Sequence, residues 1–139
     1  MRVLRVDHLG IAVADIAKAK RVYEDILGLK LTHEEVVADQ GVKTYFYPIA
    51  GLKLELLESI DPEGAIARFI EKRGQGLQHV AVEVEDIEEA LAELAAKGVP
   101  LIDKVPRKGV ENSRIAFVHP KATEGVLLEL VELPHPVTD

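Results

Sequence analysis

The segment His8-Leu9-Gly10-Ile11-Ala12-Val13-Ala14-Asp15-Ile16 has a counterpart 71 positions later, His79-Val80-Ala81-Val82-Glu83-Val84-Glu85-Asp86-Ile87. Leu54-Glu55-Leu56 has a similar echo in Leu128-Glu129-Leu130. Such repetition indicates two similar halves, each with one histidine and one glutamate in matched places. Paired halves can bring these four groups together, and that composition is typical of a divalent-metal site.

The first half predicts a strand, a helix and three more strands. Residues 3–13 are rich in β-branched and apolar types, and Asp15 can cap a helix whose apolar positions follow the helical period until Gly28. Extended segments follow near 29–37, 42–48 and 52–58, separated by turn sequences at 39–41 and 48–51.

A connector helix is predicted over 61–76, starting at Asp61-Pro62 and ending at Gly74-Gln75-Gly76. The second half then repeats the order of the first. Asp86 and Glu89 form an acidic capping box for a helix that ends at Lys97-Gly98, and strands are expected near 99–103, 113–118 and 125–131.

These elements predict an α+β fold of two tandem βαβββ modules, about 3–58 and 77–133, within one domain of residues 1–139. A four-stranded sheet with a helix on one side leaves its other face to be covered. We expect the two curved sheets to face each other around a central metal-binding cavity.

Composition narrows the classes of partner. The net charge of −7 disfavours non-specific binding to nucleic acid or to an anionic membrane surface, and favours a small ligand. The sequence has neither a secretory leader nor an apolar run of membrane-spanning length, so a cytoplasmic protein is expected. One basic cluster is either a solvated loop or a local site for an anion, and it comprises Lys104, Arg107, Lys108 and Arg114.

The metal hypothesis depends on joint placement, since a single histidine or a single strand glutamate is usually an ordinary polar residue. The predicted ligands are His8, Glu55, His79 and Glu129. The chain has no cysteine, so nitrogen and oxygen must hold the ion, and Co, Mn, Fe, Ni, Zn and Mg all remain possible. Four protein ligands leave positions open in an octahedral shell for water or substrate.

With these residues in place, the chain resembles the vicinal oxygen chelate superfamily, also called the glyoxalase/bleomycin resistance/dioxygenase superfamily. Within it, the chain is most similar to the methylmalonyl-CoA epimerase family, over nearly its whole length. The segments that carry the resemblance are Asp39-Gln40-Gly41-Val42, Leu54-Glu55-Leu56-Leu57-Glu58, Gly76-Leu77-Gln78-His79-Val80-Ala81 and Arg114-Ile115-Ala116-Phe117-Val118-His119-Pro120-Lys121.

The resemblance implies an isomerase that inverts C2 of methylmalonyl-CoA through an enolate, with a divalent metal, cobalt being the first choice. It implies an acyl-CoA substrate, a homodimer, and substrate contacts from Gln40, Arg114 and Lys121. Glu129 is the first candidate for proton transfer.

The second proton carrier stays open, because this chain has Thr44 where some bacterial relatives carry a glutamate. Another group, a water near Thr44, or one base working on both faces could serve. His119 and Lys121 are possible substitutes, although His119-Pro120-Lys121 is better explained as a turn that contacts ligand phosphates. His33 and His135 have no counterpart in the other half, and no catalytic role is assigned to them.

Two alternatives remain at this stage. One is a lyase of the glyoxalase I type, which would use a similar ligand set and the same enediolate chemistry. The other is a non-catalytic member of the superfamily that binds a small molecule between the two halves.

Overall fold

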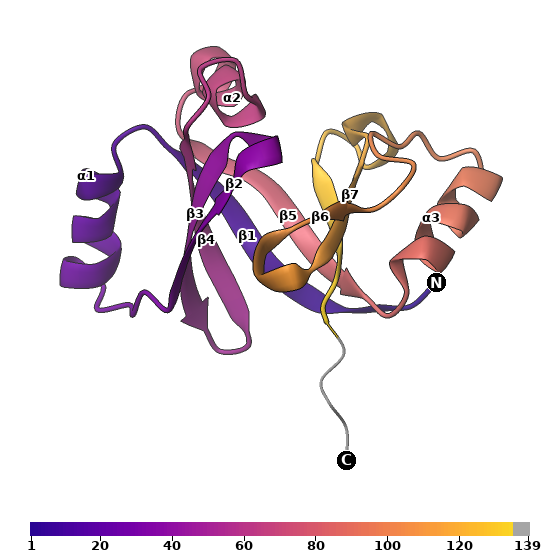
Figure 1. Ribbon diagram of the computed structural model, residues 1–139, viewed down its shortest axis with the longest axis horizontal. Coiled ribbons are helices and arrows are strands. Elements are labelled where there is room, and N and C mark those ends of the chain that lie inside the picture. The colour runs from indigo at the N-terminus through magenta and orange to yellow at the C-terminus, as the bar shows by residue number, and fades with distance from the viewer. Residues whose placement is uncertain (135–139) are drawn as a thin grey trace. The chain divides into compact units, whose positions relative to one another are not determined.

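The computed structural model describes residues 1–134, so His135 lies outside the described part of the chain. The chain divides into two compact units. The N-terminal unit is His8–Gln78, and the C-terminal unit combines Met1–Asp7 with the residues from His79 onward. Each unit contains strands backed by a helix, as Figure 1 shows. The predicted α+β class and the tandem order of elements are therefore confirmed.

The N-terminal unit has the strand order β2-β3-β4-β1. Its strands are β1 (Val3–Val13), β2 (His33–Val37), β3 (Val42–Ile49) and β4 (Leu52–Ser59). β1 runs parallel to β4, and the other neighbouring strands are antiparallel. The helical segments of this unit are α1 (Ile16–Lys20), η1 (Arg21–Ile26), the short η2 (Ala38–Gln40) and α2 (Ala65–Arg73).

The first helix begins as the sequence predicts, because the Asp15 side chain accepts a hydrogen bond from the Lys18 amide at 3.2 Å. It differs in becoming a π-helix, η1, in which the Leu27 amide bonds the Val22 carbonyl at 2.9 Å. Tyr23 and Glu24 both contact Tyr47 of β3, through ring stacking at 5.9 Å and a hydrogen bond of 2.6 Å. The wider turn of a π-helix allows the consecutive residues Tyr23 and Glu24 to contact the same tyrosine. The spacing of apolar residues along the chain does not predict such a tertiary contact.

The C-terminal unit has the order β5-β8-β7-β6. Its strands are β5 (Gly76–Val84), β6 (Arg107–Lys108), β7 (Arg114–Val118) and β8 (Leu128–Glu132), joined by α3 (Ile87–Ala96) and the short turns η3 (Val110–Asn112) and η4 (Pro120–Ala122). Asp86 caps α3 by accepting from the Glu89 amide at 3.0 Å. Ile87, Ala90 and Leu91 of α3 pack on the sheet in one buried cluster.

Two predicted boundaries were wrong. The strand expected at 99–103 is reduced to a single bridge between Leu101 and Val118, because Pro100 lacks an amide hydrogen and the Asp103 carboxylate accepts the Phe117 amide at 2.9 Å. The connector helix begins at Ala65, not at residue 61. Asp61 instead closes a turn, in which its carboxylate accepts from the Glu63 amide at 2.9 Å.

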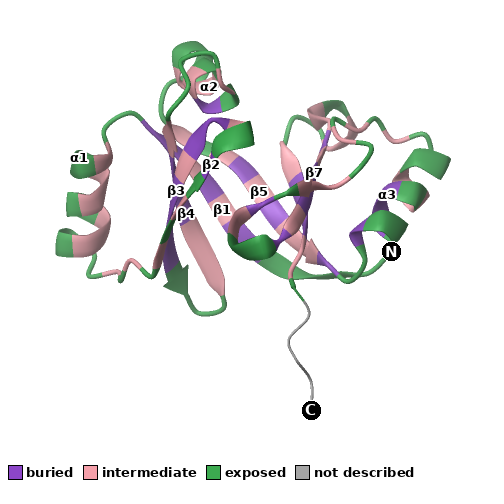
Figure 2. Cartoon of the chain, viewed as in Figure 1, coloured by how far each residue is buried: buried purple, intermediate pink, exposed green. Residues whose placement is uncertain are grey.

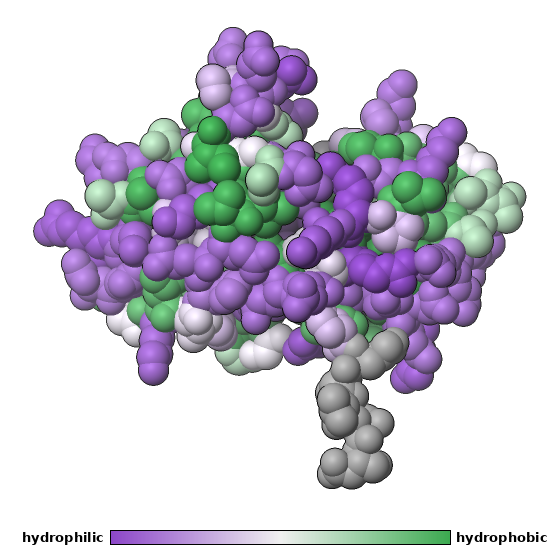
Figure 3. Space-filling view, viewed as in Figure 1, coloured by the Kyte–Doolittle hydropathy of each residue, from purple (hydrophilic) through white to green (hydrophobic). Residues whose placement is uncertain are grey.

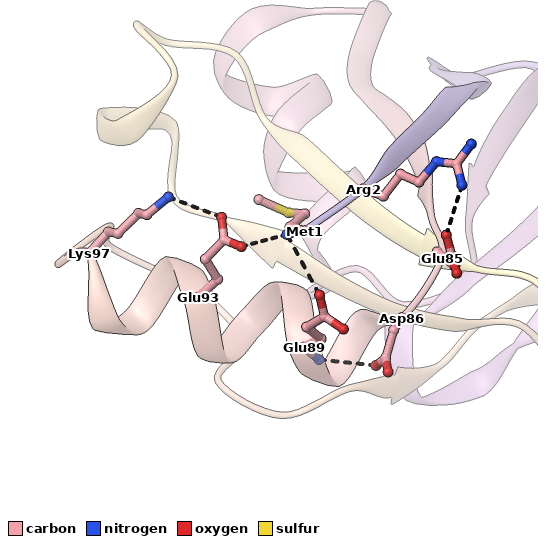
Figure 4. Close-up of polar contacts among 7 residues, drawn as sticks. All are labelled: Met1, Arg2, Glu85, Asp86, Glu89, Glu93 and Lys97. Carbon is pink, nitrogen blue, oxygen red and sulfur yellow. Dashed lines mark hydrogen bonds and ion pairs between the residues drawn. The ribbon is translucent and has the colours of Figure 1, made fainter.

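Residues 3–7 lie within the predicted first module, and in the structure Met1–Asp7 make their contacts in the C-terminal unit. The Met1 amino group bonds Glu93 of α3 at 2.5 Å, a contact that raises the pKa of this amine (Figure 4). Arg5 donates to Glu83 of β5 at 2.8 Å, and the Arg2 carbonyl accepts the Glu85 amide at 3.2 Å. β1 therefore starts in one unit and ends in the other.

Figure 2 shows buried residues concentrated in the strands and along one side of α3. Hydrophilic residues dominate the face seen in Figure 3, and apolar residues are interspersed among them. Among residues 1–134, none of the helices has the length and apolar character needed to cross a bilayer.

The hydroxyl of Tyr47 tests how η1 is held to the sheet. Burial, followed by the hydrogen bond to Glu24, raises the pKa of Tyr47 above its ordinary value of 10.0, so the phenol is a neutral donor. Tyr47→Phe should lower the free energy of unfolding by about 1 kcal/mol, the usual net value of one hydrogen bond. Because the folded pKa is raised, this contribution is present below pH 10 and is lost as the pH rises further.

Urea unfolding at neutral pH and above pH 10 measures the difference. Tyr23→Phe is the matched control, since it removes a hydroxyl from the other ring of the same stacked pair. Equal losses in the two variants would mean that the bond to Glu24 contributes nothing.

Candidate metal centre

In each unit, the strands have one face packed on the helix and a second face, which we call the ligand face. Side chains alternate between the faces along a strand, so the register assigns them. Val13, Tyr45, Tyr47 and Leu56 form the core cluster on the α1 side of the N-terminal unit. The ligand face of that unit carries His8, Glu35, Thr44, Phe46, Glu55 and Leu57. In the C-terminal unit it carries His79, Ala81, Ile115, Phe117, Glu129 and Val131.

The N-terminal unit buries an imidazole beside a carboxylate. His8 Nε2 lies 3.5 Å from Glu55 Oε2, and the two residues are only 5% and 4% exposed. A carboxylate removed from water is costly unless positive charge or a metal compensates it. The β4 sequence around Glu55 is otherwise apolar, since Leu54, Leu56 and Leu57 flank it.

The C-terminal unit repeats this arrangement. His79 Nε2 lies 3.9 Å from Glu129 Oε1, and these residues are 5% and 4% exposed. The edge of the His79 ring meets the Phe117 ring at 5.7 Å and 88°, which fixes the plane of the imidazole.

The register shows that the two glutamates are structurally equivalent. Gly10 of β1 is aligned with Glu55, and Ala81, which lies 71 positions after Gly10, is aligned with Glu129. Phe46 and Phe117 also lie 71 positions apart and face the same two glutamates from β3 and β7. The longer spacing between the glutamates arises in the loop between β7 and β8, which contains η4.

The donor set fits a divalent ion. Each unit offers one imidazole nitrogen and carboxylate oxygens within 4 Å of each other, on a buried part of a sheet. Nitrogen and carboxylate ligands without sulfur suit Mn, Fe, Co, Ni, Zn or Mg. A bound cation would also offset the cost of burying two carboxylates.

Other residues singled out by sequence lie elsewhere. Thr44 is buried, and its hydroxyl donates to the Glu35 carbonyl at 3.2 Å. His119 Nδ1 accepts from the Lys121 amide at 3.0 Å, so the predicted turn at 119–121 is confirmed. Lys121 is exposed and Gln40, in η2, is partly exposed. Their contacts with a substrate stay predictions.

The basic cluster separates into two roles. Arg114 lies on the α3 side of the sheet, where it bonds Glu88 at 2.6 Å and Glu132 at 3.3 Å. Its predicted contact with a substrate stays a prediction. Arg107 projects on the ligand face instead, 5.9 Å from the centre of the Phe117 ring, with Asp103 at 3.2 Å. Strand alternation in β6 and β7 distinguishes these arginines once the register is known.

Comparison with known proteins identifies the family. The model of the Glyoxalase/Bleomycin resistance protein/Dioxygenase superfamily matches residues 7–117. The chain is 43% identical to the uncharacterized protein YqjC of Bacillus subtilis, over 92% of this chain and 91% of that protein. It is 33% identical to the ethylmalonyl-CoA/methylmalonyl-CoA epimerase of Cereibacter sphaeroides, over 93% and 98% of the two chains.

Solved structures agree over nearly the whole chain. The methylmalonyl-CoA epimerase of Mycobacterium tuberculosis superposes with a TM-score of 0.90 at 41% identity, covering 96% of this chain and 90% of that one. A methylmalonyl-CoA epimerase in complex with methylmalonyl-CoA and NH4+ gives 0.90 at 35% identity, covering 95% and 96%. The chain thus belongs to the glyoxalase/bleomycin resistance/dioxygenase superfamily and, within it, to the methylmalonyl-CoA epimerase family. The predicted resemblance and the vicinal oxygen chelate fold are confirmed.

Proposed function

We propose that this protein is a metal-dependent epimerase that interconverts (R)- and (S)-methylmalonyl-CoA. The observation that carries the proposal is the pair of buried histidine–glutamate contacts at equivalent register positions. The choice of substrate is supported by the similarity to the ethylmalonyl-CoA/methylmalonyl-CoA epimerase of Cereibacter sphaeroides, which matches 93% of this chain.

We further propose that His8, Glu55, His79 and Glu129 converge on one divalent ion, with cobalt as the first choice. When bound, such an ion supplies Lewis acidity toward two neighbouring oxygens of the substrate, the thioester carbonyl and the free carboxylate. The two imidazoles and two carboxylates fix its position, and their burial keeps bulk water away from the reacting carbon.

The chemistry that remains for the chain is proton transfer at C2. Glu129 is held in a buried strand beside His79, so its carboxylate has a defined direction. We assign to Glu129 the removal or return of the proton on one face of C2. The reaction requires no nucleophile and no redox cofactor, because only the C–H bond at C2 is broken and remade.

A homodimer and a cytoplasmic location also stay part of the proposal. The homodimer rests on the family resemblance, and light scattering of the purified protein measures the molar mass that decides it.

Isotope exchange tests the reaction directly. Metal-loaded protein incubated with (R)-methylmalonyl-CoA in deuterated water should exchange the C2 proton and produce the (S) epimer, as followed by NMR and chiral analysis. Absence of exchange, together with turnover of a glutathione hemithioacetal, would favour the glyoxalase I type lyase. Ligand binding that chelator leaves unchanged would favour a non-catalytic binding protein.

Metal stoichiometry tests the shared ion. Wild-type protein should bind one Co²⁺ per chain. His8→Ala and His79→Ala should each lower the affinity for Co²⁺ by ~10-fold or more, because even the loss of a residue that contacts a metal ligand has an effect of this size. Competition with a chromophoric chelator measures both values. His33→Ala is the control, because His33 pairs with Glu35 and not with a predicted ligand. Two ions per chain, of which each variant loses one, would show that the pairs act separately.

The two arginines provide a third test. Arg107→Met should raise KM for methylmalonyl-CoA at least ~10-fold by removing a cation from the ligand face, with a smaller effect on kcat. Arg114→Met should leave KM unchanged and lower the free energy of unfolding by up to about 1 kcal/mol, since its ion pairs are partly exposed. Steady-state kinetics and urea unfolding of both variants decide the assignment, and a reversed pattern would restore Arg114 as the substrate contact.

A further inference from the structure

Inversion at C2 needs proton transfer on both faces of the carbon, and Glu129 can serve only the face toward which it points. The inference that follows rests on the proposed function. It concerns the second proton carrier, which the sequence does not identify because Thr44 occupies the position where some relatives have a glutamate.

Thr44 is committed to the architecture of the sheet. It is 1% exposed, and its hydroxyl donates to the backbone carbonyl of Glu35 on β2 at 3.2 Å. A hydroxyl bonded in this way ties the edge strand β2 to β3. It supplies no carboxylate for proton transfer.

The residue directly opposite Thr44 does carry a carboxylate. Glu35 is the register partner of Thr44, so its side chain projects on the same ligand face. His33, two positions earlier, also lies on that face, and its Nε2 is 2.8 Å from Glu35 Oε1. The Glu35 side chain is 29% exposed, so it is neither sealed in the core nor free in solvent.

The register places this pair beside the candidate ligands. His33, Phe46 and Glu55 are aligned across β2, β3 and β4, and Glu35 lies in the next row with Thr44. Neighbouring strands are about 4.8 Å apart, which puts the backbones of His33 and Glu55 roughly 10 Å apart. An acyl group held near Glu55 can occupy that interval above the buried ring of Phe46.

The other charged groups on the N-terminal unit's strands are less suited. Glu34 and Glu58 lie on the helix side, where Glu58 accepts from the Tyr45 hydroxyl at 2.7 Å. Lys53 shares the ligand face, with its ammonium 5.0 Å from the centre of the Phe46 ring, but a protonated amine has no lone pair with which to take a proton. Among the described residues of these four strands, Glu35 and Glu55 are thus the carboxylates on the ligand face.

We propose that Glu35 is the second proton carrier of the epimerase, positioned by His33. In one direction, the Glu35 carboxylate takes the C2 proton, and the electrons of the C–H bond pass into the enolate. The enolate then takes a proton on its opposite face, the face assigned above to Glu129, and this new C–H bond completes the inversion. The Glu35 carboxylic acid loses its proton to water through its exposed part, and a proton from solvent replaces the one delivered to C2. The site therefore starts each turnover in the same state.

Glu35→Gln separates the two faces of C2. Each epimer of methylmalonyl-CoA is incubated separately with metal-loaded variant in deuterated water, and both exchange and inversion are followed. Epimerisation should fall ~100-fold or more, the usual contribution of a general acid or base. One epimer should still exchange its C2 proton without inverting, because Glu129 serves that face, whereas the other epimer should lose exchange. Metal content should equal that of the wild type, and Glu35→Asp should recover part of the activity.

Glu34→Gln is the matched control, a neighbouring carboxylate on the opposite side of the same strand, and should behave as wild type. Wild-type rates of epimerisation in Glu35→Gln would overturn the assignment and leave the proposed function intact. The same holds if Lys53→Gln, and not Glu35→Gln, gives the one-sided exchange. A wild-type protein that neither exchanges nor inverts would overturn both proposals.

Discussion

Each half of the chain buries an imidazole next to a carboxylate, His8 with Glu55 and His79 with Glu129. An ionised glutamate inside an apolar strand is expensive, and Glu55 and Glu129 are both almost fully removed from water. A structural pair could meet this cost within one half. Its repetition at the same register position in both halves points to a role in binding, since core packing alone does not require a charge at either place.

Much of this arrangement could be predicted from sequence because it is written in local patterns. The duplicated stretch identified both histidines, and the caps at Asp15 and Asp86 act within three residues of their partners. Glu55 and Glu129 were recognised even though their spacing differs from that of the histidines, because each lies between leucines.

What the sequence could not supply depends on contacts between distant residues. The π-helix at η1 reflects the shared contact of Tyr23 and Glu24 with Tyr47. The lost strand near residue 101 reflects the Asp103 carboxylate, which replaces a backbone partner for Phe117. The face of the sheet on which Arg107 and Arg114 lie follows from the register of β6 and β7. The position of Glu35 on the ligand face likewise follows from its alignment with Thr44.

The crossing of β1 from one unit to the other has a consequence for biosynthesis. Residues 1–7 are synthesised before the intervening unit, and their partners Glu83, Glu85 and Glu93 lie more than 75 residues further along the chain. The apolar side chains of Val3, Leu4 and Val6 must therefore wait in an unpaired segment while the intervening unit is synthesised. Closing so long a loop is entropically costly, which slows the docking of residues 1–7 onto β5 and α3. The C-terminal unit, unlike His8–Gln78, therefore cannot be made from one continuous stretch of the chain.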